Sequence, residues 1–227
     1  MAHANRPRRQ HLHEQGLDTT IVIIPDAFCR PEHYDLPVTS RRALGADIVI
    51  VVQNPSTRLM GASAAGVPAG LYDDTANARV VVEGLVRDGR SVLVVAHSYG
   101  ALVASECVKG LGREGLMGVQ PGGVVRMVLI AGIVPLEGQS LNEAVNGRLG
   151  IGPPDDVVGG FMYHKQEKLA ARFYSSLPAC RSLEHAGATN TEQSVRSFEE
   201  RLRYAGYRGI PVTYMVTTAD QMVPVEL

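Results

Sequence analysis

The chain has 227 residues, 45% of them hydrophobic and 20% charged, which is the composition of one or two globular domains and excludes a disordered protein. Its 22 Lys and Arg against 23 Asp and Glu give a formal net charge of −1, so no basic excess favours nucleic acid as a partner. The longest apolar runs are far shorter than a membrane span. Residues 1–18, which we expect to form a flexible tail, lack the apolar run of a secretory signal. These features predict a cytoplasmic protein that neither binds nucleic acid nor enters a membrane.

Short runs rich in β-branched residues occur along the chain, at residues 20–25, 47–53, 91–96, 124–133 and 211–216. They are apolar without alternation, which is typical of strands buried on both faces of a parallel sheet. Helical patterns separate these runs, at residues 31–44, 72–87 and 100–109. The alternation of strands and helices predicts a doubly wound α/β domain over residues 19–227.

Residues 135–210 interrupt this alternation. We expect helices at 161–175 and 190–204, with Gly and Pro between and before them. An insertion between two strands of a doubly wound sheet lies over the carboxyl edge, where such folds bind ligands. The segment therefore predicts a cap over a pocket, for which four aromatic residues are candidate lining: Phe161, Tyr163, Phe173 and Tyr174.

No motif indicates a metal or an organic cofactor, and we expect none. His11 and His13 are two possible metal ligands, but no third ligand is near them in sequence, so a solvated tail is the preferred interpretation. The glycine-rich residues 110–123 lack the GKS or GKT ending of a phosphate-binding loop. The three cysteines form no CxxC pair, which argues against a zinc site and a disulfide framework.

Residues 92–103, with the sequence VLVVAHSYGALV, carry the clearest chemical signal. A buried strand runs directly into a helix, and the small residues Ala96 and Gly100 flank Ser98. A sharp turn of this kind holds a serine in a strained conformation above the sheet, and its neighbours must be small so that strand and helix can approach. The helix N-terminus also offers free N–H groups to an oxyanion. The segment predicts a nucleophilic serine.

The chain resembles the α/β-hydrolase superfamily, and within it small fungal esterase-like proteins. The resemblance runs from Thr20 to the last residue, and four segments carry it. They are PDAF (25–28) with PEHY (31–34), FY (173–174) with LP (177–178), YRGIP (207–211), and TTAD (217–220) followed by Pro224. The resemblance implies a small-molecule carbonyl substrate with an apolar body, in secondary metabolism.

Carried over residue by residue, the resemblance implies that Ser98 is the nucleophile and Asp220 the acid that orients the base. The backbone N–H groups of Ala27 and Tyr99 would form the oxyanion hole. Asp26 stands where the family has glycine. Because turns commonly hold aspartate, we expect the Asp26 carboxylate to point outward into solvent.

The triad histidine of this fold follows the last strand, but the sequence ends at Leu227, seven residues after Asp220, so the expected strand and histidine are absent from it. Three histidines are candidates for a substitute base or a pocket residue. His97 is expected to turn into the fold as a packed, hydrogen-bonded side chain, whereas His164 and His185 lie in the cap. For His33 we expect a capping or surface role.

Three hypotheses therefore stay open. The chain is a serine hydrolase for an ester or thioester, a lyase, isomerase or cyclase that uses the same pocket, or a non-catalytic binding protein. Without the last strand, the edge of the strand at 211–216 is exposed. We expect it to be covered by a second copy of the chain in a homodimer, covered by residues 1–18, or left marginally stable.

Overall fold

The computed structural model describes residues 19–44, 48–62, 66–119, 121–188 and 190–225. The expected tail, with His11 and His13, lies outside the described residues. Within these ranges no helix is both long enough and apolar enough to cross a membrane.

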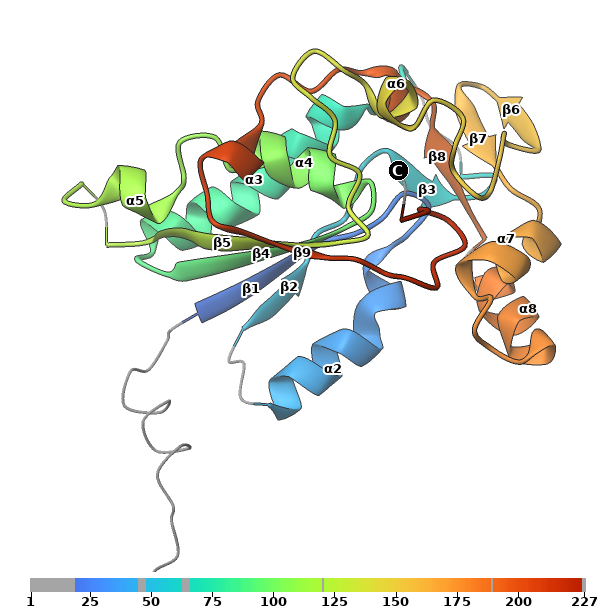
Figure 1. Ribbon diagram of the computed structural model, residues 1–227, viewed down its shortest axis with the longest axis horizontal. Helices are drawn as coiled ribbons and strands as arrows, with labels where there is room; N and C mark the ends of the chain where they lie inside the picture. Colours follow the sequence, from blue (N-terminus) through green and yellow to red (C-terminus); the bar gives the residue numbers. More distant parts are fainter. Residues whose placement is uncertain (1–18, 45–47, 63–65, 120, 189, 226–227) are drawn as a thin grey trace, which may run out of the picture.

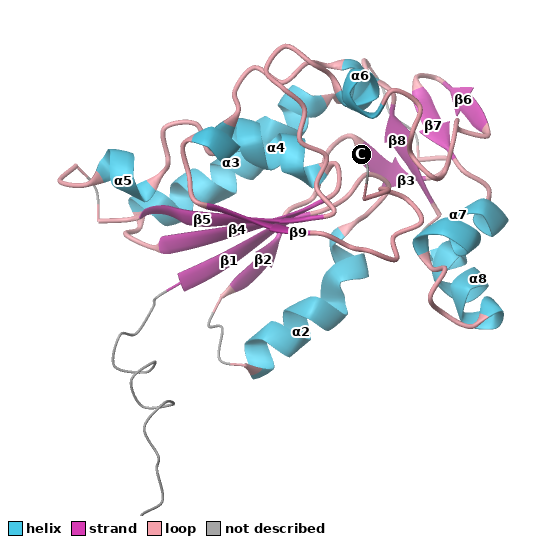
Figure 2. Cartoon of the chain, in the orientation of Figure 1, coloured by secondary structure: helices cyan, strands magenta, loops and turns pink. Residues whose placement is uncertain are grey.

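The main sheet is parallel, and all the strands predicted for it are present. It consists of β1 (Thr19–Ile24), β2 (Val49–Val51), β4 (Ser91–His97), β5 (Gly123–Ile130) and β9 (Val212–Met215), in the order β2-β1-β4-β5-β9. Figures 1 and 2 show α2 (Asp35–Ala43) on one face of the sheet and both α3 (Leu71–Arg87) and α4 (Gly100–Cys107) on the other. The predicted doubly wound α/β fold is confirmed.

The core lies between the sheet and α3 and α4. The central strand β4 contributes Val92, Val94 and Ala96, all of which are fully buried. Helix α3 has a buried apolar stripe at helical spacing, which includes Ala78 and Val82. On the other face of β4, Leu93 and Val95 are half-buried, so the strand is fully buried on one face and partly covered on the other.

Strand β9 is at the edge of the sheet, as expected. Its Tyr214 and Met215 side chains are 44% and 50% exposed. What covers this edge in solution stays a prediction.

A second, antiparallel sheet, which the sequence did not predict, combines strands of the cap with one strand from outside it. Its strands are β3 (Thr57–Leu59), β6 (Asp156–Val158), β7 (Phe161–Tyr163) and β8 (Thr191–Ser194), in the order β3-β8-β7-β6. Figure 1 shows this sheet beyond the carboxyl ends of the main strands, beside α7 (Gln166–Phe173) and α8 (Ala179–Ala188). The remaining elements are η1 (Pro31–Tyr34), α5 (Arg113–Leu116), α6 (Leu141–Val145), α9 (Arg196–Glu199) and η2 (Gly206–Arg208).

Two helix predictions in the cap are corrected by the structure. Residues 161–175 begin as strand β7 and become helical only in α7, and residues 190–204 form β8 and the single turn α9. The β8 sequence TEQS is polar, so its pattern did not suggest a strand. All four residues are nevertheless buried. Thr191 and Gln193 hydrogen-bond to Phe28 and Thr57, which are distant in sequence.

Candidate active site

Ser98 sits on the predicted sharp turn between β4 and α4. Its φ is +49°, a left-handed conformation that is strained for serine, and the residue is 8% exposed. A Cβ at Gly100 would lie 2.4 Å from the Ile24 carbonyl oxygen and 2.7 Å from that of Pro25. Only glycine at position 100 therefore lets α4 start this close to β1, and this approach makes the turn.

An apolar cavity of about 440 Å³ opens beside Ser98, under the cap. Its lining combines residues from the main fold with residues of the cap, including Ile133, Leu141, Val145, Met162, Phe173 and Phe198. Of the four aromatic residues expected to line a pocket, Phe173 does so. Phe161 instead packs under the Arg58 guanidinium, 3.5 Å from its ring centroid, and Tyr174 stacks on His185.

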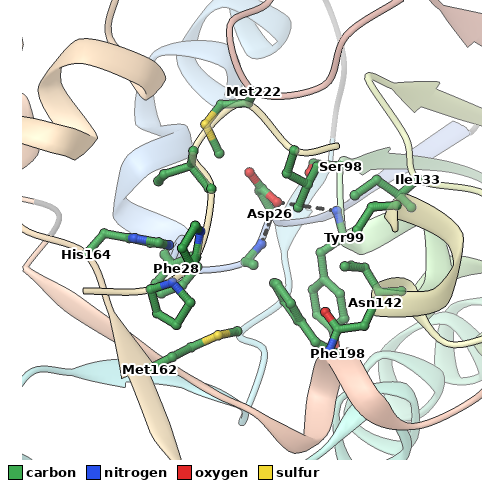
Figure 3. Close-up of a pocket in the computed structure, with 18 of the residues that line it drawn as sticks. Asp26, Phe28, Ser98, Tyr99, Ile133, Asn142, Met162, His164, Phe198 and Met222 are labelled. Carbon is green, nitrogen blue, oxygen red and sulfur yellow. Dashed lines mark hydrogen bonds between the residues drawn. The ribbon is translucent and has the colours of Figure 1, made fainter. Parts of the chain in front are cut away.

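The two N–H groups predicted for the oxyanion hole do converge, but on the carboxylate of Asp26. Asp26 Oδ1 accepts hydrogen bonds from Ala27 N at 2.7 Å and from Tyr99 N at 3.3 Å, as Figure 3 shows. The residue is only 6% exposed. The expectation that Asp26 points into solvent is therefore wrong. An anion is stabilised by two N–H donors, one of which, Tyr99 N, lies at the start of α4. These donors outweigh the general tendency of turn aspartates to face water.

Opposing effects act on the Asp26 carboxyl group. Burial raises its pKa above the ordinary value. The charge of His97, the hydrogen-bonding hydroxyl of Ser98 and the N–H groups of Tyr99 and Ala27 partly offset this rise. The site thus holds a carboxyl group that takes up a proton more readily than one in water.

His97 is hydrogen-bonded to a tyrosine. Its Nδ1 lies 2.9 Å from the Tyr34 hydroxyl, and the same hydroxyl accepts a hydrogen bond from Asp26 N at 3.0 Å. The expected hydrogen bond is present, but His97 is half-buried and lines the second cavity described below, so it is not packed in the core. The pair also fixes the backbone of Asp26.

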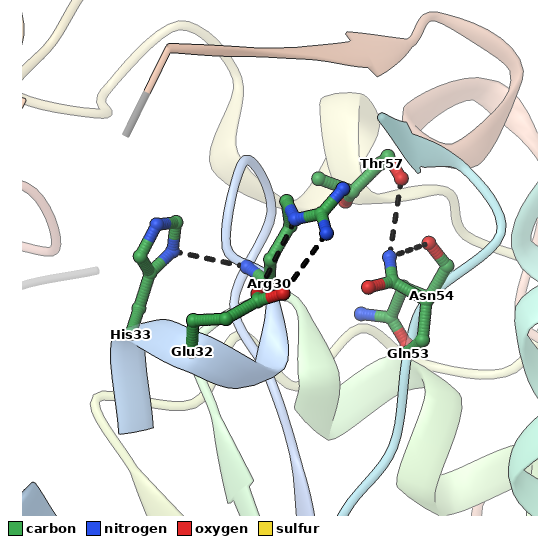
Figure 4. A network of polar contacts seen from close by, with 6 residues as sticks. All are labelled: Arg30, Glu32, His33, Gln53, Asn54 and Thr57. Carbon is green, nitrogen blue, oxygen red and sulfur yellow. Dashed lines mark hydrogen bonds and ion pairs between the residues drawn. The ribbon is translucent and has the colours of Figure 1, made fainter. Parts of the chain in front are cut away.

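The loop that carries Asp26 and Ala27 is fastened from two sides. Phe28, with φ of +60°, donates its N–H to Gln193 Oε1 at 3.0 Å, and Asn54 Nδ2 donates to the Pro25 carbonyl at 3.2 Å. Figure 4 shows the next stretch of this loop, where the His33 ring accepts the N–H of Arg30 at 3.0 Å. The capping role expected for His33 is confirmed. In the same view, the Gln53 amide donates to the carbonyl groups of Asn54 and Thr57.

A buried carboxyl group supports Tyr99 from behind. Asp74 is fully buried and accepts hydrogen bonds from the Tyr99 hydroxyl at 2.5 Å and from Ser56 N at 2.8 Å and Oγ at 2.5 Å. Desolvation raises the pKa of Asp74 to about 6, although these hydrogen bonds oppose the rise. The network fixes the residue whose N–H faces Asp26.

Asp220 lines a second cavity of about 530 Å³, and Asp26, His97 and Ser98 line the same cavity. Its carboxylate is oriented by its own loop, because Oδ2 accepts from Thr217 Oγ1 at 2.8 Å and Oδ1 from Met222 N at 2.7 Å. The structure therefore brings the predicted acid and nucleophile to one cavity. His97 is the one histidine among the described residues that line this cavity.

The two cap histidines differ in position. His164 lines the apolar cavity, and Figure 3 shows it on the opposite side of Asp26 from Ser98. Burial lowers its pKa to about 4, so the imidazole is neutral at pH 7. His185 stacks on Tyr174 with ring centroids 5.5 Å apart, and it is not among the residues that line either cavity at Ser98.

Sequence comparison identifies the family. Residues 21–227 match the alpha/beta hydrolase family. The chain belongs to this family. Two fungal members are similar to it: "Probable hydrolase R7" of Phoma sp. is 28% identical over 91% of this chain and 79% of its own length. "Alpha/beta hydrolase nvfD" of Aspergillus novofumigatus is 29% identical over 92% of this chain and 80% of its own.

Solved structures agree with this assignment at the level of the fold. Polyneuridine aldehyde esterase superposes with a TM-score of 0.65 at 15% identity, covering 92% of this chain and 84% of its own. The pyrethroid hydrolase PytH has a TM-score of 0.58 at 16% identity, covering 91% and 80%. The hydrolase fold of the present chain is therefore shared with enzymes of very different sequence.

Two site residues escaped the sequence analysis. Gln193 and Asp74 hold the loop and the helix start that carry the N–H donors, yet neither lies in a motif. The only local signal was the pair of acidic residues Asp73 and Asp74 at the start of a helix, which is equally typical of a solvated first turn.

Proposed function

We propose that this protein hydrolyses an ester or thioester of a small apolar metabolite, with Ser98 as the nucleophile. One observation carries the proposal: the strained Ser98 lies beside an apolar cavity, next to two N–H groups that converge on one acceptor position. Hydrolysis of a carbonyl substrate requires a nucleophile and a pair of donors for the oxyanion in this relation. We assign Asp220, oriented across the second cavity, as the acid of the site.

The substrate class follows from the cavity. A volume of about 440 Å³ with an apolar lining suits a compact, uncharged molecule rather than a long acyl chain or a peptide. The names of the fungal relatives, a probable hydrolase and an alpha/beta hydrolase, are consistent with this chemistry. We place the activity in secondary metabolism in the cytoplasm.

The position of Asp26 favours a second candidate. A carboxylate that occupies the oxyanion position is suited to proton transfer on a substrate, as in a lyase, isomerase or cyclase, without a covalent intermediate.

Labelling with a fluorophosphonate, read by intact mass, separates the two candidates. The hydrolase proposal predicts one adduct per chain, lost in Ser98→Ala. It also predicts that labelling is retained in Ser176→Ala, which removes an exposed hydroxyl from the lining of the second cavity. A folded wild-type protein that takes up no label would refute hydrolysis through Ser98 and leave proton transfer as the better account.

A further inference from the structure

Asp26 Oδ1 occupies the place where the oxygen of a reacting carbonyl would sit. The position is defined by Ala27 N at 2.7 Å and Tyr99 N at 3.3 Å, the donors assigned to the oxyanion. An atom held by the N–H of the residue after the nucleophile lies close to the nucleophile's own oxygen, since the oxyanion and that oxygen are bonded to the same carbon. Ser98 lines both cavities together with Asp26, and hydrogen bonding to its hydroxyl is one of the effects that lower the pKa of the Asp26 carboxyl group.

His97 and Asp220 also line the second cavity with Ser98, and each has a hydrogen-bonding partner of its own. Nδ1 of His97 is engaged with Tyr34, and Asp220 is bonded by its own loop across the second cavity. The His164 imidazole lies on the opposite side of Asp26. Of the described carboxyl and imidazole groups, Asp26 is the one that lines both cavities beside Ser98.

We propose that Asp26 is the proton acceptor for Ser98, and that its carboxylate and the substrate oxyanion use the N–H groups of Ala27 and Tyr99 in turn. This inference rests on the hydrolase function proposed above and names the base for it.

Ser98 Oγ forms a bond to the carbonyl carbon, the π electron pair moves to the carbonyl oxygen, and the hydroxyl proton moves to Asp26. The neutral carboxylic acid is a weaker partner for the two N–H donors than the new oxyanion, so the oxyanion replaces it. When the C–O bond of the ester breaks, the proton passes from Asp26 to the leaving alkoxide. Water then attacks the acyl-enzyme carbonyl while Asp26 accepts its proton. The proton passes from Asp26 to Ser98 Oγ as the Oγ–C bond breaks and the carboxylic acid leaves.

The net charge of the site is the same before and after the attack. One negative charge leaves the Asp26 carboxylate and one appears on the substrate oxygen, a short distance away in a buried site. This exchange avoids placing two anions side by side in a region of low dielectric, where their repulsion would be large.

Several charged or titratable groups face Asp26 and enter its pH dependence. His97 faces Asp26 from the end of β4. Cys29, on the same loop as Asp26, and Tyr34, in η1, flank Asp26. Asp220 and Arg172 face Asp26 across the second cavity. Burial raises the pKa values of both Cys29 and Tyr34, so these two groups are neutral at pH 7. Burial of Asp26 itself raises its pKa, which brings a base of this type closer to the working range.

The test compares fluorophosphonate labelling rates of the wild type, Asp26→Asn and Asp26→Ala as a function of pH. Asparagine keeps the shape and an acceptor oxygen for the two N–H groups but takes up no proton, whereas alanine empties the position. We expect the wild-type rate to rise with pH and level off as Asp26 ionises. Both variants are expected to be slower by about 10²–10⁴-fold and to lack this limb. Circular dichroism verifies that each variant is folded.

The alternative role gives results of the opposite sign. If Asp26 merely blocks the oxyanion position, Asp26→Ala labels as fast as the wild type or faster, and the inference is overturned while Ser98 remains the nucleophile. If the wild type itself takes up no label, the proposed hydrolysis fails together with its base. If the wild type is labelled at a rate that does not change with pH, Asp26 is also refuted as the base.

Discussion

Titration of Asp74 is expected to make the stability of the protein depend on pH. Asp74 is fully buried behind Tyr99 and accepts three hydrogen bonds, from the Tyr99 hydroxyl and from N and Oγ of Ser56. The proposed change is Asp74→Asn, which has nearly the same shape. It removes the titratable group while leaving an oxygen to accept the Ser56 N–H.

The magnitude follows from the pKa values. The pKa of Asp74 is about 6 in the folded protein, against 3.8 for the ordinary group, and one pKa unit corresponds to about 1.4 kcal/mol. Between pH 3.8 and 6 the unfolded chain loses this proton while the folded protein keeps it, so stability falls as the pH rises. The free energy of unfolding is expected to fall by about 3 kcal/mol across this window because of Asp74 alone.

Urea unfolding of the wild type and Asp74→Asn at several pH values between 4 and 7 measures this effect. Other groups contribute equally to both proteins, so the difference between their unfolding free energies isolates Asp74. We expect the variant to gain about 3 kcal/mol relative to the wild type on going from pH 4 to pH 7. A difference that does not change with pH would refute the reasoning.

Three further predictions concern the turn, the loop and the cap. Because Ser98 has φ of +49°, Ser98→Gly is expected to be about 1 kcal/mol more stable than Ser98→Ala in urea unfolding, and equal stability would contradict the strain. Gln193→Leu leaves Phe28 N unpaired and is expected to cost on the order of 2 kcal/mol and to slow labelling of Ser98. Wild-type labelling kinetics in that variant would show that the loop is held by other contacts. The pKa of His164 is about 4 in the folded protein, so stability is lost as the pH falls from 6.5 through 4. His164→Leu should remove about 2 kcal/mol of this loss, after allowance for solvent screening, as measured by unfolding at pH 4 and 7. An unchanged acid limb would exclude His164 as its source.

The parts of the fold that could be predicted from the sequence are those with a local cause. The central strands of the main sheet are continuously apolar, with one face buried in the core, and the turn at Ser98 needs small neighbours that adjoin it in sequence. Both signals are visible in short windows of residues.

The rest depends on contacts between distant segments. Strand β8 is polar, and it is buried because Gln193 bonds to Thr57, 136 residues away. The inward direction of Asp26 depends on Tyr99 N, 73 residues further along the chain. Such partners are brought together only by the complete fold, so a rule based on turn composition predicted the wrong direction for Asp26.

The measurement that most directly tests nucleophilic catalysis by Ser98 is a pre-steady-state experiment with a small aryl ester, followed by intact mass analysis. Our account predicts a burst of about one equivalent of phenolate and a protein mass increased by the acyl group, both lost in Ser98→Ala. Steady turnover with neither a burst nor an acylated species, under conditions where deacylation has been slowed, would contradict it.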